Sequence, residues 1–244
     1  MTRAPSPSLL GALKALLGPK GYTDNVEAMA PWLSDWRGKY HGAAAAMLSP
    51  TSTEEVSALV RLCGDAGVAI VPQGGNSGMV GGATPDASGT QILLSMRRMN
   101  QIRNIDRDGG LAVVEAGVIL EHFHETALAQ GLRFPLTLGG KGSATTGGLV
   151  STNAGGTQVL RHGTMRALTA GIEAVLPDGS VFEGLAPLKK DNRGYDLRHL
   201  LCGAEGTLGI VTAATLRLVP AISARRTVWI GLGSPHDAVL LLRQ

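Results

Sequence analysis

The sequence has 244 residues, 44% of them apolar, which is enough for one large domain or two small lobes with buried cores. The formal net charge is +3, but the basic residues are scattered and aromatic residues make up only 4%, which argues against a nucleic-acid-binding surface. Cys63 and Cys202 form no CxxC motif and are expected to be small buried side chains. No apolar run is long enough to span a membrane and no secretory signal is recognisable, so we expect a cytoplasmic protein.

A helix followed by a strand is predicted after an N-terminal helical segment that we place at residues 1–41. Ser52 and Glu55 have the spacing of a capping box, and the apolar stripe that follows is typical of a helix that Gly67 can end. The apolar run 68–71 stops at Pro72, which indicates a buried strand leading into a loop.

Further strands and a helix complete a mixed α and β pattern. Residues 92–94 and 111–114 are expected to be strands, and residues 120–128 a helix that ends at Gly131. Residues 171–184 have the pattern of a hairpin with a Pro-Asp-Gly turn, and a β-rich stretch follows at 206–218. The pattern therefore predicts the α+β class.

The first loop of interest reads PQGGNSGMVGG, residues 72–82, directly after the predicted strand. Clustered glycines leave a row of main-chain N–H groups without side chains to cover them, and such a row binds phosphate oxygens. The loop is not a Walker A motif, because no Lys-Ser or Lys-Thr pair follows, and it lacks the spacing of the Rossmann fingerprint. A tight turn without a ligand would be equally rich in glycine.

A second glycine-rich run, residues 139–156, has seven glycines in eighteen positions and apolar flanks, so we expect ordered irregular backbone. Two such loops about sixty residues apart favour one long ligand held at more than one point, and a dinucleotide is the natural candidate. The run also supplies side-chain donors and acceptors at Ser143, Thr145, Thr146, Thr152 and Asn153.

Four segments, taken in order, resemble one known family. They are SDWRGKYHG, PQGGNSGMVGG, FPLTLGGKGSATTGGLVSTNAGG and KKDNRGYDLRHLLCGAEGTLGIVTAATLRLVP, and the similarity runs from about Asp35 to Pro220. They are similar to the FAD-linked oxidases with the vanillyl-alcohol-oxidase or PCMH-type FAD-binding fold. Within that family they resemble the D-2-hydroxyglutarate and D-lactate dehydrogenases and the FAD-linked part of glycolate oxidase.

The resemblance implies a PCMH-type FAD-binding domain at 42–220, made of two α+β lobes, about 42–115 and 116–220, with FAD between them. It places the FAD pyrophosphate on the first loop, the flavin and ribityl chain along the second, and the adenine end beside the GAEGTLGIVT stretch. The residues that it assigns to FAD are Pro72, Gly74, Gly75, Asn76, Ser77, Gly78, Gly82, Pro135, Gly142, Ser143, Gly147, Gly148, Thr152, Asn153, Gly156, Gly206, Ile210 and Val211.

Three positions depart from the family pattern. Ser77 stands where the family usually has Thr, and His162 stands where it usually has an aromatic residue. Members that attach FAD covalently often have a His after the paired glycines of the first loop. Asn76 occupies that position here, so the resemblance implies FAD bound without a covalent link.

The activity implied is oxidation of a small D-2-hydroxy acid to the 2-oxo acid, with an electron-acceptor protein or a quinone as partner and a homodimer as one assembly. In the resembling enzymes the catalytic groups and any divalent metal lie mainly in a later domain, so no catalytic residue is assigned. Residues 221–244, where Ser234 and Pro235 can begin a helix, are interpreted as the start of a truncated C-terminal substrate (cap) domain.

Two other functions stay open at this point. One is a non-enzymatic or inactive FAD- or nucleotide-binding module, and the other is a nicotinamide-dependent reductase. His122 and His124 are two apart on a predicted helix and face different directions, so we do not expect them to share a metal. Lys189 and Lys190 are interpreted as a solvated charge patch.

Overall fold

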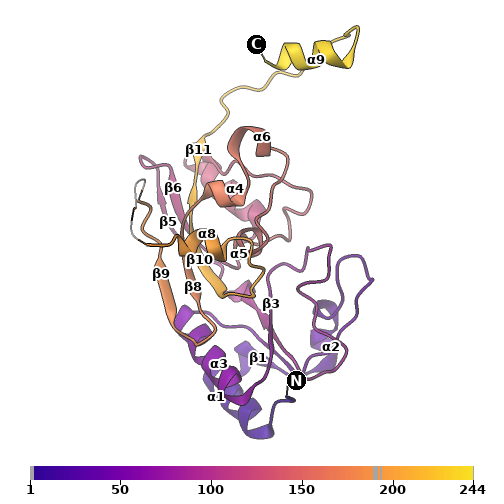
Figure 1. Ribbon diagram of the computed structural model, residues 1–244, viewed down its shortest axis with the longest axis vertical. Helices are drawn as coiled ribbons and strands as arrows, with labels where there is room; N and C mark the ends of the chain where they lie inside the picture. The colour runs from indigo at the N-terminus through magenta and orange to yellow at the C-terminus, as the bar shows by residue number, and fades with distance from the viewer. Residues whose placement is uncertain (1–2, 189–191, 193, 244) are drawn as a thin grey trace.

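Two β-sheets organise the chain in the computed structural model, which describes residues 3–188, 192 and 194–243 (Figure 1). The first sheet has the strand order β1-β2-β4-β3. Its strands are β1 (Tyr22–Thr23), β2 (Ala46–Leu48), β3 (Ile70–Gln73) and β4 (Ile92–Ser95). Strands β2 and β3 both run parallel to β4, whereas β1 is antiparallel to β2.

Helices α1 (Pro7–Gly21) and α3 (Thr53–Ala66) cover the first sheet. Helix α3 begins and ends as predicted, because the Ser52 side chain accepts a hydrogen bond from the Glu55 N–H and Gly67 is left-handed. The leucines of α1 pack into the same core as the apolar face of α3, so residues 7–23 are part of the first lobe. Short helices α2 (Val26–Met29) and η1 (Ala30–Trp32) follow β1.

The second sheet is antiparallel throughout, with the order β5-β6-β10-β8-β9. Its strands are β5 (Ile102–Asp106), β6 (Leu111–Glu115), β8 (Thr169–Val175), β9 (Val181–Gly184) and β10 (Ile210–Arg217). Strands β8 and β9 form the predicted hairpin. Helix α4 (Leu120–Ala129) covers this sheet, and the ring of its Phe123 lies 5.0 Å from that of Phe134 in the core.

The structure confirms the α+β class and differs from the expected elements at three points. Strand β3 runs through Pro72 and is only half-buried; as an edge strand bonded to β4 alone, it tolerates a proline. Strands β5 and β6 hydrogen-bond into the second sheet, which moves the division between the sheets to residues 96–101 instead of 115. The second glycine-rich run contains a short helix, α5 (Thr146–Ser151), where irregular backbone was expected.

The remaining elements are short. They are η2 (Met96–Arg98), β7 (Leu132–Arg133), α6 (Val159–His162), α7 (Met165–Leu168), α8 (Leu197–Leu201), β11 (Val219–Pro220) and α9 (Pro235–Leu242). Ser234 caps α9 as predicted, and Figure 1 shows this helix extending away from the two sheets. Lys189 and Lys190 lie outside the described residues, so their interpretation stays a prediction. Over the residues that are described, no helix is both long and apolar enough to cross a membrane.

Candidate cofactor-binding site

The first glycine-rich loop leaves a row of main-chain N–H groups available to a ligand. The N–H groups of residues 74–78 donate to no other residue that the structure describes. Asn76 has a left-handed φ of 51°, which Asn tolerates better than most residues, and its side-chain N–H donates to the Ser34 carbonyl at 2.8 Å. The loop is therefore held in place by its side chain while its N–H groups stay free, as an anion-binding nest requires.

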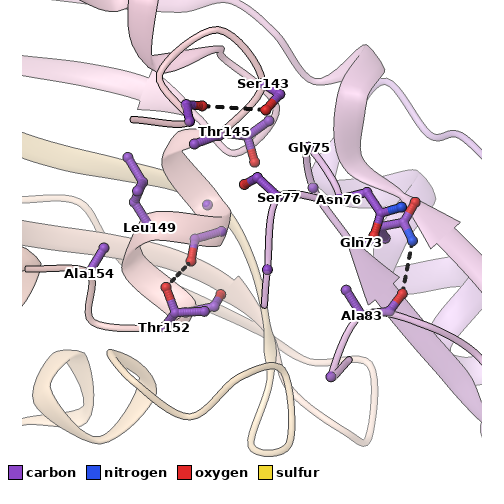
Figure 2. Close-up of a pocket in the computed structure, with 18 of the residues that line it drawn as sticks. Gln73, Gly75, Asn76, Ser77, Ala83, Ser143, Thr145, Leu149, Thr152 and Ala154 are labelled. Atoms are coloured by element: carbon purple, nitrogen blue, oxygen red, sulfur yellow. Dashed lines mark hydrogen bonds between the residues drawn. The ribbon is translucent and has the colours of Figure 1, made fainter. Parts of the chain in front are cut away.

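The second glycine-rich loop packs directly against the first, as Figure 2 shows. A Cβ atom on Gly75 would lie 1.6 Å from the Ser143 carbonyl oxygen, and one on Gly74 would lie 2.2 Å from Thr145 Oγ1. These two glycines are thus required by the contact between the loops. At Gly78, by contrast, no described atom lies within 4 Å of an added Cβ, so that position is open.

A third segment, at residues 205–211, closes the remaining side. Gly206 is left-handed with φ 79°, and a Cβ there would lie 2.5 Å from the Pro72 ring. The Glu205 carboxylate lies 3.3 Å from the Cβ that Gly82 lacks. Three segments that are far apart in sequence therefore meet around one space.

That space is a cleft of about 790 Å³, which is at the upper end of the usual range for small-molecule sites. Fifteen of the eighteen residues that the resemblance assigned to FAD line it. They are Pro72, Gly74, Gly75, Asn76, Ser77, Gly78, Gly82, Gly142, Ser143, Gly147, Gly148, Thr152, Gly206, Ile210 and Val211. The sequence prediction therefore selected residues that the fold brings together.

Pro135, Asn153 and Gly156 do not line the cleft. Asn153 accepts a hydrogen bond from the Arg166 N–H at 3.0 Å, and Gly156 is left-handed against the Thr137 carbonyl, so both have structural roles. Pro135 is buried beside the core. These three positions are conformational supports of the second loop in this structure.

Several lining residues were missed by the sequence prediction, and two carry unpaired polar atoms. Thr145 Oγ1 and Gln73 Oε1 are buried and have no hydrogen-bond partner among the described residues. The Gln73 amide orientation is well determined, because its nitrogen donates to two carbonyls, of Trp32 and Ala83, both at 2.9 Å. Buried polar atoms without partners indicate that a polar ligand or ordered water completes the site, which fits a dinucleotide.

Other missed residues add apolar surface, notably Trp36, Met96, Ala116 and Leu149. Ala116 is placed by close packing, because a Cβ on Gly147 would lie 2.5 Å from its own Cβ. The signal for these residues lies in three-dimensional neighbours and not in local motifs. Trp36 alone had a local signal, since it belongs to the SDWRGKYHG segment.

Asp35 shapes that segment into a tight turn beside the cleft. Its buried carboxylate accepts main-chain hydrogen bonds from Tyr40 and Lys39, both at 2.7 Å, and from Arg37 at 3.1 Å. These bonds, with that from Tyr40 the strongest influence, lower the pKa of Asp35 below its ordinary value. The turn carries Trp36 to the cleft and presents the Ser34 carbonyl to Asn76.

We expect Asp35→Ala to weaken FAD binding and lower the melting temperature, because three main-chain N–H groups lose their acceptor. Asp35→Asn should fall between Asp35→Ala and the unchanged protein, since its amide oxygen can still accept from Lys39 and Tyr40. A fluorescence titration with FAD and a thermal melt measure the two effects. Equal FAD affinity in all three proteins would show that the turn has no influence on the cleft.

A two-sheet α+β fold with glycine-lined loops converging on one cleft defines a dinucleotide-binding domain. The chain matches the family of the FAD binding domain over residues 44–184, which is more than half of its length. It therefore belongs to that family, and its cofactor is FAD. This confirms the fold and the cofactor that the resemblance implied.

The chain is also similar to several enzymes of known name. It is 41% identical over 217 residues to the mitochondrial D-2-hydroxyglutarate dehydrogenase of Arabidopsis thaliana, covering 89% of this chain and 38% of that protein. It is 39% identical over 206 residues to a D-2-hydroxyglutarate–pyruvate transhydrogenase of Saccharomyces cerevisiae, covering 84% of the chain and 41% of that protein. The chain thus spans about two fifths of the length of these relatives.

Among solved structures, the chain superimposes on alkyldihydroxyacetonephosphate synthase with a TM-score of 0.80 and 26% identity. The match covers 91% of this chain and 42% of that protein. The synthase also superimposes in a second crystal form, with a TM-score of 0.79. The two-sheet arrangement is therefore one that solved proteins adopt.

The comparisons overturn the predicted cellular setting. The relatives from Arabidopsis thaliana and Bos taurus, each 41% identical, are named mitochondrial, so the cytoplasmic prediction is wrong. That prediction used the lack of a secretory signal and of a membrane span, and a mitochondrial protein needs neither.

Proposed function

We propose that this chain is the FAD-binding part of a dehydrogenase that oxidises a small D-2-hydroxy acid to the 2-oxo acid. The observation that carries the proposal is the cleft, in which free main-chain N–H groups and unpaired buried atoms face one space. The substrate class is supported by the names of the relatives, which include a putative D-lactate dehydrogenase of Schizosaccharomyces pombe at 40% identity.

In this proposal the N–H groups of residues 74–78 hold the pyrophosphate, and the second loop lies along the ribityl chain and flavin. Residues 206–211 lie beside the adenine end. Thr145 Oγ1, which is buried without a partner among the described residues, donates to the same ligand. FAD is bound without a covalent link, because Asn76 stands at the position of a linking His and its amide is engaged by Ser34. Bound FAD would supply the acceptor for the substrate hydride.

The remaining chemistry needs a base for the hydroxyl proton and a cation for the substrate carboxylate. In the described residues no three His, Cys, Asp or Glu side chains gather as a metal site. We therefore place the base, the carboxylate-binding groups and any divalent metal in the region of the relatives that this chain does not match. The electron acceptor, a protein or a quinone, and a homodimeric assembly carry over from the resemblance alone.

The test begins with the purified chain, which should retain FAD through desalting after reconstitution. The longest protein encoded by the same reading frame should then lose its flavin absorbance anaerobically on adding D-2-hydroxyglutarate, D-lactate or glycolate. A flavin that stays oxidised with every hydroxy acid would favour the non-enzymatic module. Binding of NADH with no retention of FAD would favour the nicotinamide-dependent reductase.

A further inference from the structure

A second cavity, of about 700 Å³, lies on the other side of a chain segment that forms one wall of the cofactor cleft. Met96 and Ala116 line the cofactor cleft, whereas their neighbours in sequence, Arg97 and Gly117, line the second cavity. A Cβ on Gly117 would lie 2.1 Å from the Met96 carbonyl, so the two segments of this wall are in direct contact. The second cavity is therefore separate from the cofactor cleft.

Two guanidinium groups face this cavity in defined positions. The Arg97 guanidinium stacks on the Trp32 ring, 4.2 Å from its centroid, which leaves its N–H edge free. Arg98 donates to the Ser49 carbonyl at 2.9 Å and so keeps further N–H groups available. The cation of each is held in place by a neutral partner.

No described carboxylate balances these charges. The described lining of the cavity contains no Asp or Glu, and neither arginine forms a salt bridge with a described residue. His122 and Asn100 add further donors at the rim. Charged groups gathered in a hollow are stabilised by an opposite charge, so the cavity is electrostatically suited to an anion.

Ser95 provides an independent indication of a ligand. Its residue is only 4% exposed, it lines the cavity, and its hydroxyl forms no hydrogen bond with a described residue. A buried hydroxyl normally has a partner. The partner that this geometry leaves room for is a ligand oxygen between Ser95 and the two arginines.

We propose that this cavity binds a small molecule through a carboxylate or phosphate group. The oxyanion is held by Arg97, Arg98 and Ser95, while Trp32 and Met47 contact its apolar part. A planar guanidinium fork matches the oxygens of either group. The site goes beyond the proposed FAD function, because none of these residues lines the cofactor cleft.

The experiment is an NMR titration of the FAD-loaded, ¹⁵N-labelled protein at constant ionic strength, with inorganic phosphate in one arm and malonate in the other. Saturable shifts are expected at the Trp32 indole and the Arg97 Nε signals. Tighter binding of phosphate would identify a phosphate ester as the ligand class, and tighter binding of malonate a carboxylate. FAD occupies the first cleft throughout, so the anions cannot report on that cleft.

Arg97→Met and Arg98→Met should each weaken anion affinity about tenfold, since each removes one charge-assisted contact. Arg225→Met is the matched control, because Arg225 is exposed and removing it changes the net charge equally. Ser95→Ala tests the site without changing any charge and should also weaken binding. The proposal is overturned if neither anion gives saturable shifts, or if Arg225→Met weakens binding as much as Arg97→Met does.

Retention of FAD by each variant, measured by absorbance after desalting, shows that the variant is folded. Should Arg97→Met fail this check, Arg98→Met and Ser95→Ala still decide the outcome. Loss of anion binding with FAD retained supports the second site and leaves the FAD proposal untouched. Loss of FAD binding in the unchanged protein would instead contradict the proposed function and not the second site.

Discussion

Gly75→Ala is expected to abolish FAD retention, and Gly75→Val should do the same. Even the single Cβ of alanine would lie 1.6 Å from the Ser143 carbonyl oxygen and 2.5 Å from its carbon, which are main-chain atoms and cannot rotate away. The two glycine-rich loops must therefore separate, and the row of N–H groups at residues 74–78 moves away from the second loop. Separated loops cannot hold one dinucleotide at two points.

Two matched variants distinguish loop packing from ligand contact. Gly78→Ala meets no described atom within 4 Å, so it should leave the melting temperature of the FAD-free protein unchanged and weaken FAD binding if the ligand lies there. Gly11→Ala, in α1, is equally free of contacts and far from the cleft in sequence, so it should change neither FAD binding nor the fold. The measurements are flavin absorbance after desalting and thermal melts without FAD. Retention of FAD by Gly75→Ala would contradict the placement of the first loop.

The elements that could be predicted from the sequence are those whose causes are local. Helix α3 begins at Ser52 and ends at Gly67 because a side-chain cap and a left-handed glycine act within one turn. The β8–β9 hairpin follows from its Pro-Asp-Gly turn. Cys63 and Cys202 are buried as expected. In each case the residues that decide the structure are a few positions apart.

The features that were missed depend on partners distant in sequence. Strand β6 was assigned to the first lobe because nothing in residues 111–115 indicates that β10, about a hundred residues later, is its neighbour. The same limit applies to the site. The glycines were identified, but the reason for Gly75 became visible only when Ser143 was placed against it. Thr145 became a candidate donor through burial without a described partner, which no sequence pattern reports.

Glu173→Gln is expected to destabilise the protein by about 2–3 kcal/mol at neutral pH, because Glu173 joins the two sheets. Its carboxylate accepts hydrogen bonds from Thr53 at the start of α3, from Thr212 on β10, and from Arg103 on β5. The first of these comes from the layer that covers the first sheet, and the other two come from the second sheet. Arg103 keeps a second partner in Glu115 at 3.1 Å, which limits the loss.

The dependence on pH tests whether the charge of Glu173 is responsible. Burial raises the pKa of Glu173, but hydrogen bonds from Arg103, Thr53 and Thr212 outweigh it, so the pKa in the folded protein lies below its ordinary value. A lowered pKa adds stability that is fully present above the pKa of the unfolded chain and is lost as pH falls through the folded-state value. Urea denaturation at about pH 7 and about pH 4 should therefore show the gap between the unchanged protein and Glu173→Gln narrowing in acid. Exposed Glu183→Gln, on neighbouring β9, is the control and should show no gap at either pH. A gap for Glu173→Gln that stayed constant with pH would mean that the carboxylate charge contributes nothing and that only the shape of the side chain matters.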